Sequence, residues 1–199
     1  MTDVIVDESD SIINKGQVGA ISGPNLSGEI LEGKLALTTV AFTDLSTAKT
    51  VQKYLNSPTL RPYTSTDLIG VQYGGALKNI IAIASGFADG SNLGNNAKAS
   101  LITRGLNEIK TLGMSQGAQE ETFYGLSGIG DLITTCYSKL SRNYRFGNHL
   151  ARGLKVESCL AEISGTVEGL NTTTSAYSIM QKHKLELPII SSIYKVLYE

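Results

Sequence analysis

The run from Ile69 to Ala88 constrains the fold more than any other part of the sequence. Its residues are almost all apolar or small, and Lys78 is the one charged side chain among them. A run of about 20 such residues is long enough to span a membrane. Lys78, Asn79 and Gln72 near its centre argue against a span. We therefore expect a core helix. Lysine side chains are rarely fully buried unless they are paired, so Lys78 needs an explanation.

The helix face around Lys78 is unusually small. Residues three and four positions away share the face of a helical residue, and here they are Gly74, Gly75, Ile81 and Ala82. Three of these four are small, so the lysine stem can lie in a shallow hollow. A lysine in such a cleft can act as a general acid or base. The alternative is a lysine that reaches water or pairs with one carboxylate, and the helix pattern alone favours this alternative.

Composition and charge limit the class of protein. The 199 residues are 41% hydrophobic and 18% charged, which is typical of a globular protein. The net charge of −1 and the lack of a long basic run argue against a nucleic-acid partner. Cys136 and Cys159 have neither metal-site nor disulfide spacing, and the acidic start lacks an apolar signal core. We expect reduced thiols, no metal site and a cytoplasmic location.

The pattern of the chain changes near residue 64. Residues 1–64 consist mainly of strand and turn material with one helix, an α/β alternation. The strands are expected at 18–22, 35–42 and 60–63, and the helix at 44–54.

Residues 65–199 are predicted to be all helical. The longest predicted helix runs to Phe87 from a cap at Thr66 or Asp67. The next has Asn95 or Asn96 as its cap and Gly113 as its C′ residue. The other helices are predicted at 120–124, 141–152, 156–163, 172–183 and 189–198.

Three polar donors are expected to gather at the start of one helix. Ser141 supplies a hydroxyl, Arg142 a forked cation and Asn143 an amide. A helix start also offers free N–H groups, so together they indicate an anion site. The alternative, plain capping beside a surface arginine, is favoured when the motif is taken alone.

Three further positions have two readings each. Asp131 follows two glycines and either holds Lys78 or caps a turn or helix. Gly23 either lets a ligand approach the backbone or forms an ordinary turn with its neighbours. Glu168 contacts either a polar ligand or only solvent. We interpret His149 and His183 as structural or solvated residues.

Six motifs, in order, resemble one family. The chain is similar to the bacterial-type NAD(P)-dependent glycerol-3-phosphate dehydrogenases, from about residue 20 to residue 198. The motifs are GPN (23–25), GGALKNIIAIASG (74–86), NNAKASLITRG (95–105), GLSGIGDLITTC (125–136), LSRNYRFG (140–147) and TVEG (166–169).

This resemblance implies a fold and a reaction. We expect residues 1–64 to be the C-terminal part of a Rossmann domain. Residues 65–199 are expected to form a helical substrate domain like the C-terminal domain of 6-phosphogluconate dehydrogenase. The family reduces dihydroxyacetone phosphate to sn-glycerol 3-phosphate with NADH or NADPH, so the resemblance implies a phosphorylated triose substrate and NAD or NADP as cofactor. We expect no nucleic acid and no membrane span, and consider a homodimer as the assembly.

The resemblance also assigns roles to residues. Lys78 matches the catalytic lysine that donates a proton to the carbonyl oxygen. The substrate-binding positions that match are Gly23, Asn25, Lys78, Asp131, Ser141, Arg142 and Asn143. The cofactor-binding positions that match are Ser27, Arg142, Thr166 and Glu168.

The chain departs from the family pattern in two ways. Where the family commonly has GPSFA, residues 23–27 read GPNLS, and the sequence contains no GxGxxG loop of the kind that begins the family pattern. We therefore expect a truncated form with little activity on its own. The alternatives are a non-catalytic module that binds phosphate or forms dimers, and another lysine-dependent reductase acting on a hydroxy acid.

Overall fold

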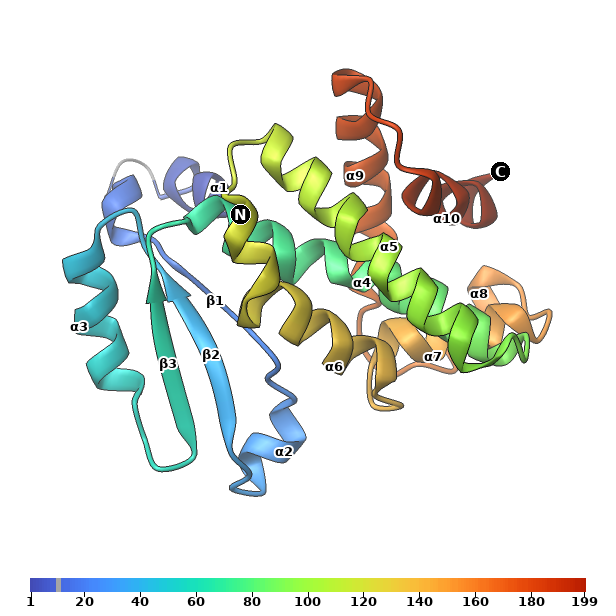
Figure 1. Cartoon of the computed structure of the whole chain (residues 1–199), viewed down its shortest axis with the longest axis horizontal. Helices are drawn as coiled ribbons and strands as arrows, with labels where there is room; N and C mark the ends of the chain where they lie inside the picture. Colours follow the sequence, from blue (N-terminus) through green and yellow to red (C-terminus); the bar gives the residue numbers. More distant parts are fainter. Residues whose placement is uncertain (10–11) are drawn as a thin grey trace.

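The computed structural model describes residues 1–9 and 12–199 (Figure 1). Strands are confined to the first third of the chain, and helices make up the rest. The elements in order are α1 (Thr2–Asp7), η1 (Lys15–Gln17), β1 (Ala20–Ser22), α2 (Ser27–Leu31), β2 (Ala36–Ala41), α3 (Leu45–Leu55), β3 (Leu60–Ser65), α4 (Leu68–Gly90), α5 (Gly94–Ser115), η2 (Glu120–Tyr124), η3 (Leu126–Gly130), α6 (Asp131–Tyr137), α7 (Arg142–Ala151), α8 (Val156–Ala161), α9 (Glu168–His183) and α10 (Pro188–Tyr198).

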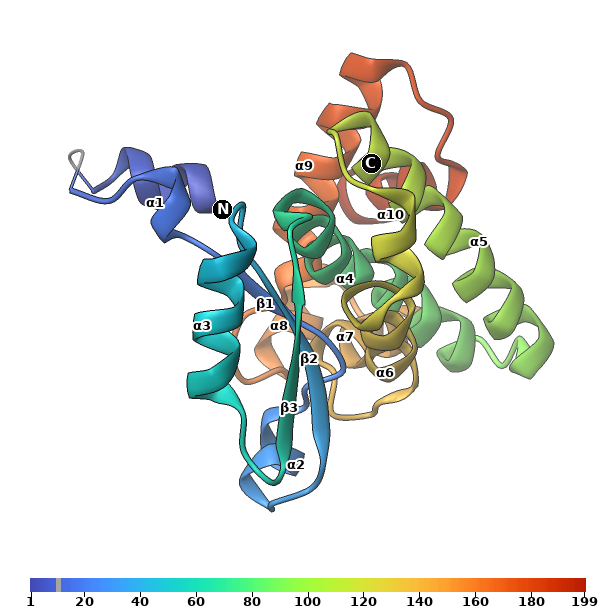
Figure 2. The same cartoon turned by 60° about the vertical axis from the view of Figure 1, so that its left-hand side comes forward.

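The three strands form one small sheet in the order β1-β2-β3. β1 runs antiparallel to β2, and β2 runs parallel to β3 with α3 as the connection between them. Val40, Phe42 and Ala48 form a buried cluster between the sheet and α3. The opposite face packs on α4 through Ala41 and Val71. Figure 2 shows α3 on one side of the sheet and the helical part on the other. The α/β unit expected in residues 1–64 is therefore present.

Helix α4 lies at the centre of the helical part, with α5, α6, α7 and α9 packed around it (Figure 1). A helix that is apolar on all sides is a buried helix, and this explains the run from residue 69 to residue 88. Gly86 of α4 and Gly147 of α7 allow the closest crossing. A Cβ on Gly86 would lie 1.9 Å from the Tyr144 carbonyl oxygen, and one on Gly147 would lie 1.9 Å from the Ile83 carbonyl oxygen.

The start of α4 agrees with the prediction, and that of α5 does not. The Asp67 side chain caps α4 by accepting a 2.8 Å hydrogen bond from the Gly70 amide. Neither Asn95 nor Asn96 caps α5, because that helix already begins at Gly94. The predicted C′ role of Gly113 is also wrong. Gly113 lies inside α5, where a Cβ would come within 2.3 Å of Phe123, and the left-handed residue after the helix is Gly117.

Two other differences concern additional helices and the start of one helix. The N-terminal region, expected to be strand and turn apart from one helix, also contains the short helices α1 and α2. α9 begins at Glu168 rather than at Thr172, so Glu168 occupies the first turn of a helix. β3 ends at Ser65 and α4 begins at Leu68. The change from strand to helix thus comes within a few residues of 64, while the division into two domains stays a prediction.

Among the described residues, no helix is both long enough and apolar enough to cross a lipid bilayer.

Candidate functional site

Lys78 and Asp131 meet where α4 passes the start of α6. The Lys78 ammonium forms a salt bridge with Oδ1 of Asp131. The lysine side chain is 20% exposed and the aspartate side chain 4% exposed, so only the lysine reaches solvent. Asp131 is the first residue of α6 and makes no cap at its own helix start. The buried Asp131 carboxylate therefore holds the ammonium of a partly exposed lysine.

Two hydroxyl groups complete the surroundings of that carboxylate. The hydroxyl of Thr135, one turn further along α6, donates to the Asp131 carbonyl oxygen at 2.7 Å and shares its proton with Oδ1 of Asp131 at 3.2 Å. Ser22, at the end of β1, donates to Oδ2 at 3.3 Å. Burial raises the pKa of Asp131 above its usual value, although the Lys78 charge and the hydroxyl donors act in the opposite direction. The carboxylate oxygens are thus bound by groups from three separate elements.

The hollow predicted beside Lys78 is filled by protein atoms. A Cβ on Gly74 would lie 2.3 Å from the Ser127 carbonyl oxygen, and a Cβ on Gly75 would lie 2.5 Å from the Ser22 hydroxyl. The two glycines therefore do not form a seat for the lysine stem. They let the η3 turn and strand β1 approach α4 on either side of it.

A cleft of about 540 Å³ opens over the pair. Sheet residues, α4 and the first turns of α9 contribute to its walls, and the start of the chain adds Met1 together with Thr2 and Ile5 of α1. The Thr2 amide donates to Gln72 Oε1 at 3.1 Å, which holds α1 against the cleft. The polar residues that line the cleft are Thr2, Ser22, Asn25, Thr38, Gln72, Lys78, Asn79, Asp131, Glu168 and Thr172.

Asn143 connects three helices beside the cleft. Its Nδ2 donates to Oδ1 of Asn79 at 3.0 Å, and its Oδ1 accepts from the Gly169 amide at 2.8 Å. Asn143 is only 4% exposed. Its side-chain amide is thus used to join α7 to α4 and α9, which corrects the expectation of a free amide donor at this helix start.

Arg142 and Glu168 pair at the edge of the site. The Arg142 guanidinium donates to Oε1 of Glu168, and the two side chains are 41% and 43% exposed. Ser141 is buried, and its hydroxyl accepts from the Tyr144 amide at 3.3 Å as the cap of α7. Of the three predicted donors, Ser141, Arg142 and Asn143, only Arg142 has an accessible side chain. Arg142 bonds to Glu168 and Asn143 bonds to Asn79, and both of these partners line the cleft.

The remaining predicted residues are divided between the cleft and the surface. Gly23 and Asn25 line the cleft. Asn25 Nδ2 donates to the Leu37 carbonyl at 3.1 Å, and a Cβ on Gly23 would lie 2.9 Å from that same oxygen. Ser27 and Thr166 are exposed and do not belong to the cleft walls. Half of the predicted residues therefore line the cleft, Arg142 and Asn143 bond to residues of its walls, and Ser27 and Thr166 lie apart.

Sequence reasoning left Ser22, Asn79 and Thr135 out of the predicted site. Asn79 directly follows Lys78 and lies seven residues after Gln72, so the two form a polar stripe on α4. That pattern could have identified Asn79, since both residues line the cleft. Ser22 directly precedes the GPN motif, but nothing in its spacing points to Asp131, which lies 109 residues later. Thr135 is one helical turn from Asp131, and that spacing would have been enough to find it.

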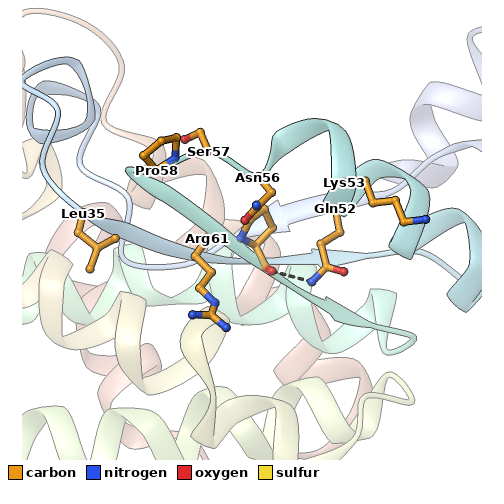
Figure 3. A pocket seen from close by; sticks show the side chains of 8 residues that line it. Leu35, Gln52, Lys53, Asn56, Ser57, Pro58 and Arg61 are labelled. Atoms are coloured by element: carbon orange, nitrogen blue, oxygen red, sulfur yellow. Dashed lines mark hydrogen bonds between the residues drawn. The ribbon is translucent and has the colours of Figure 1, made fainter.

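A second hollow, of about 650 Å³, lies between α3 and β3 (Figure 3). Gln52 donates to the Pro62 carbonyl at 2.8 Å across it. Arg61 and Lys53 contribute to its walls, but Figure 3 shows them pointing in different directions. The hollow therefore lacks convergent charged groups, and the cleft over Lys78 is the better candidate site.

Comparison with known proteins places the chain in a family. A family profile described as "NAD-dependent glycerol-3-phosphate dehydrogenase C-terminus" matches residues 67–199. A glycerol-3-phosphate dehydrogenase [NAD(P)+] of Chlamydia pneumoniae is 47% identical over 182 residues, covering 92% of this chain and 54% of the relative. One from Dehalococcoides mccartyi is 46% identical over 198 residues, covering 100% of this chain and 55% of the relative.

Solved structures agree with this assignment. The crystal structure of a glycerol-3-phosphate dehydrogenase from Coxiella burnetii matches with a TM-score of 0.88 and 38% sequence identity. The match covers 90% of this chain and 55% of that one. The chain spans about half the length of the curated relatives it matches. By the profile match, the sequence identity and the shared fold, the chain belongs to the NAD-dependent glycerol-3-phosphate dehydrogenase family.

Proposed function

We propose that the chain carries the substrate site of an NAD(P)-dependent glycerol-3-phosphate dehydrogenase, which interconverts dihydroxyacetone phosphate and sn-glycerol 3-phosphate. The observation that carries this proposal is the Lys78–Asp131 pair, a solvent-reaching ammonium held by a buried carboxylate in the floor of a cleft. The matched relatives from Chlamydia pneumoniae and Dehalococcoides mccartyi are named glycerol-3-phosphate dehydrogenases [NAD(P)+].

Lys78 is the residue we assign to donate a proton to the ketone oxygen. When bound, a nicotinamide supplies the hydride that reduces the carbonyl carbon. The carbonyl oxygen then gains negative charge, and a lysine within hydrogen-bond reach stabilises that charge and protonates the oxygen. Asp131 keeps the Lys78 ammonium directed into the cleft, while burial limits the access of water to the carboxylate.

Arg142 is the residue we assign to the substrate phosphate. It is the first residue of α7 and its side chain is accessible, so a bound phosphate would meet its forked guanidinium. Its pairing with Glu168 holds the guanidinium at the cleft edge. Ser141 and Asn143 then support this site by capping α7 and by joining it to α4.

The described residues fit one end of the cofactor. Glu168 lines the cleft and has exposed carboxylate area for a ribose hydroxyl. The strand-to-helix turn before α3, by contrast, is closed by Asp44, whose Oδ2 accepts from the Thr47 amide at 2.7 Å. Hydrogen bonds from Ser46 and Thr47 hold the pKa of Asp44 well below its usual value, so the start of α3 carries a negative charge and would repel a phosphate. We therefore expect weak nucleotide binding and little turnover by residues 1–199 alone.

Titration calorimetry with sn-glycerol 3-phosphate tests the proposed substrate site. The account predicts saturable binding that neutral glycerol does not show. Arg142→Gln should weaken the binding by about tenfold or more, the scale of one charge-assisted hydrogen bond. Arg152→Gln is the matched control, because Arg152 lies at the other end of α7.

Three results would count against the proposal: no heat of binding, equal binding of glycerol, or an unchanged affinity in Arg142→Gln. Inorganic phosphate binding as tightly as glycerol 3-phosphate, with no effect of Lys78→Gln, would instead favour a phosphate-binding module without catalytic function.

A further inference from the structure

Ser22 connects the sheet to the Lys78–Asp131 pair. It is the last residue of β1, and its hydroxyl donates to Oδ2 of Asp131 at 3.3 Å. The oxygen that faces Lys78 is the other one, Oδ1. The two carboxylate oxygens therefore have different donors. Lys78 of α4 donates to Oδ1, and Ser22 of the sheet donates to Oδ2.

The orientation of the Asp131 carboxylate needs such a second donor. The χ2 torsion of aspartate is broad, so packing alone does not fix the carboxylate plane. An ionised carboxylate only accepts hydrogen bonds, and Asp131 is buried, so an oxygen without a donor is costly. Without the Ser22 hydroxyl, the carboxylate would rotate to share its remaining donors, Lys78 and Thr135, between both oxygens.

The space for the Ser22 hydroxyl is built into α4. A Cβ on Gly75 would lie 2.5 Å from the Ser22 Oγ atom, so the glycine leaves the room that this hydroxyl occupies. The Thr38 hydroxyl donates to the Ser22 carbonyl oxygen at 3.2 Å and fixes the backbone at the same residue. Two neighbouring strands and one helix thus define where the hydroxyl lies.

We propose that Ser22 is a positioning residue that turns the Asp131 carboxylate so that Oδ1 holds the Lys78 ammonium in the cleft. Ser22 acts through Asp131, and the placement of β1 against α4 thereby sets the direction of Lys78. The catalytic use of this positioning rests on the proposed function. The orientation of Lys78 itself can be tested without measuring enzyme activity.

Competitive labelling of lysines tests the inference directly. The folded chain is treated with trace acetic anhydride, and mass spectrometry compares the labelling of Lys78 with that of Lys98. Lys98 is the internal reference, because it too is paired with a carboxylate, Asp89, at 2.7 Å, although Lys98 is more deeply buried than Lys78. Ser22→Ala should raise the Lys78-to-Lys98 labelling ratio by about 2- to 12-fold, the scale of one hydrogen bond. General loosening of the fold would raise both lysines together and leave the ratio unchanged.

Gly75→Ala provides a second variant that keeps the serine. Its added Cβ displaces the Ser22 hydroxyl, and alanine is a better helix former than glycine, so α4 itself is not weakened. It should raise the ratio as Ser22→Ala does, and it decides the matter if Ser22→Ala fails to fold. An unchanged ratio in a folded variant of either kind overturns the inference.

The same assay separates this inference from the proposed function. Saturating sn-glycerol 3-phosphate should slow the labelling of Lys78 in the unmodified chain if the substrate binds there. Absence of that protection, together with a raised ratio in Ser22→Ala, would leave the positioning role standing and contradict the proposed substrate site. Protection with an unchanged ratio would do the reverse.

Discussion

At the scale of single residues, Lys78 shows both the reach and the limit of sequence reasoning. A lone charge in a long apolar run marked it as either functional or paired, and the structure shows that it is paired. Asp131 was expected either to hold Lys78 or to cap a turn or helix, and spacing alone did not decide between the two. The two residues are 53 positions apart and come together only through the packing of α6 on α4.

Asn143 illustrates what the sequence could not provide. Three donors in three residues indicated an anion site at an exposed helix start. In the structure, that start lies against α4 and α9, and the Asn143 amide bonds to Asn79 and Gly169 instead. A local pattern lists the donors, but only tertiary packing determines which of them remain free.

The pKa of Asp131 gives a prediction for stability against pH. Because burial raises this pKa, the folded chain binds a proton more readily than the unfolded chain, whose value is near 3.8. The contribution to stability is fully present below that value and is lost as pH rises through the folded pKa. The free energy of unfolding of the unmodified chain, measured relative to Asp131→Asn by urea denaturation, should therefore fall as pH rises above about 4.

Subtracting the variant removes the effect of other shifted carboxyl groups, such as Glu108 and Asp89, which both proteins share. A difference that grows with rising pH would mean that the Lys78 charge outweighs burial at this site.

At the scale of elements, strongly periodic segments were the predictable ones. The strands at 18–22, 35–42 and 60–63 and the helices now labelled α3, α4, α7 and α10 agree with prediction within a few residues. Gly113 was misread because sequence alone does not separate a glycine needed for positive φ from one needed for close packing. A Cβ added to Gly113 would collide with Phe123, and this contact between α5 and η2 is not visible in any local sequence pattern.

The crossing of α4 and α7 carries a prediction about close packing. Gly86→Ala would place a methyl group 1.9 Å from the Tyr144 carbonyl oxygen, so the helices must separate. We expect a loss of about 1–3 kcal/mol or more in the free energy of unfolding, the range for overpacked cores. Gly28→Ala is the control, because nothing lies within 4 Å of its added Cβ. Urea denaturation of both variants checks this, and equal stabilities would contradict the described crossing.

At the scale of the whole molecule, α4 packs against both the sheet and the other helices, and it also lines the cleft. The sheet packs on it through Val71, α7 crosses it at Gly86, and Lys78 lies between these two contacts. This arrangement explains why a helix with a membrane-like composition carries a lysine. The helix is buried on most sides, and Lys78 lies where the helix faces the cleft.

The two thiols report whether the whole helical part is folded. Cys136 and Cys159 are both free and buried. Burial raises the pKa of the Cys136 thiol to about 12 and also raises that of Cys159, so neither thiol supplies much reactive thiolate at neutral pH. A thiol reagent such as dithionitrobenzoate should therefore react with neither until denaturant unfolds the chain. Rapid reaction of either cysteine in buffer would show that its surroundings differ from the described packing.

The measurement that tests the central claim most directly is thermal melting of the purified chain with and without sn-glycerol 3-phosphate. A ligand that binds only the folded state stabilises it, and at a hundredfold excess over Kd the melting temperature should rise by roughly 5 °C or more. The double variant Lys78→Gln with Asp131→Asn removes both charges and keeps polar partners, and we expect it to lose most of that rise. A cooperative melt that glycerol 3-phosphate does not shift, or an equal shift in the double variant, would contradict the claim that Lys78 and Asp131 form the centre of a substrate site.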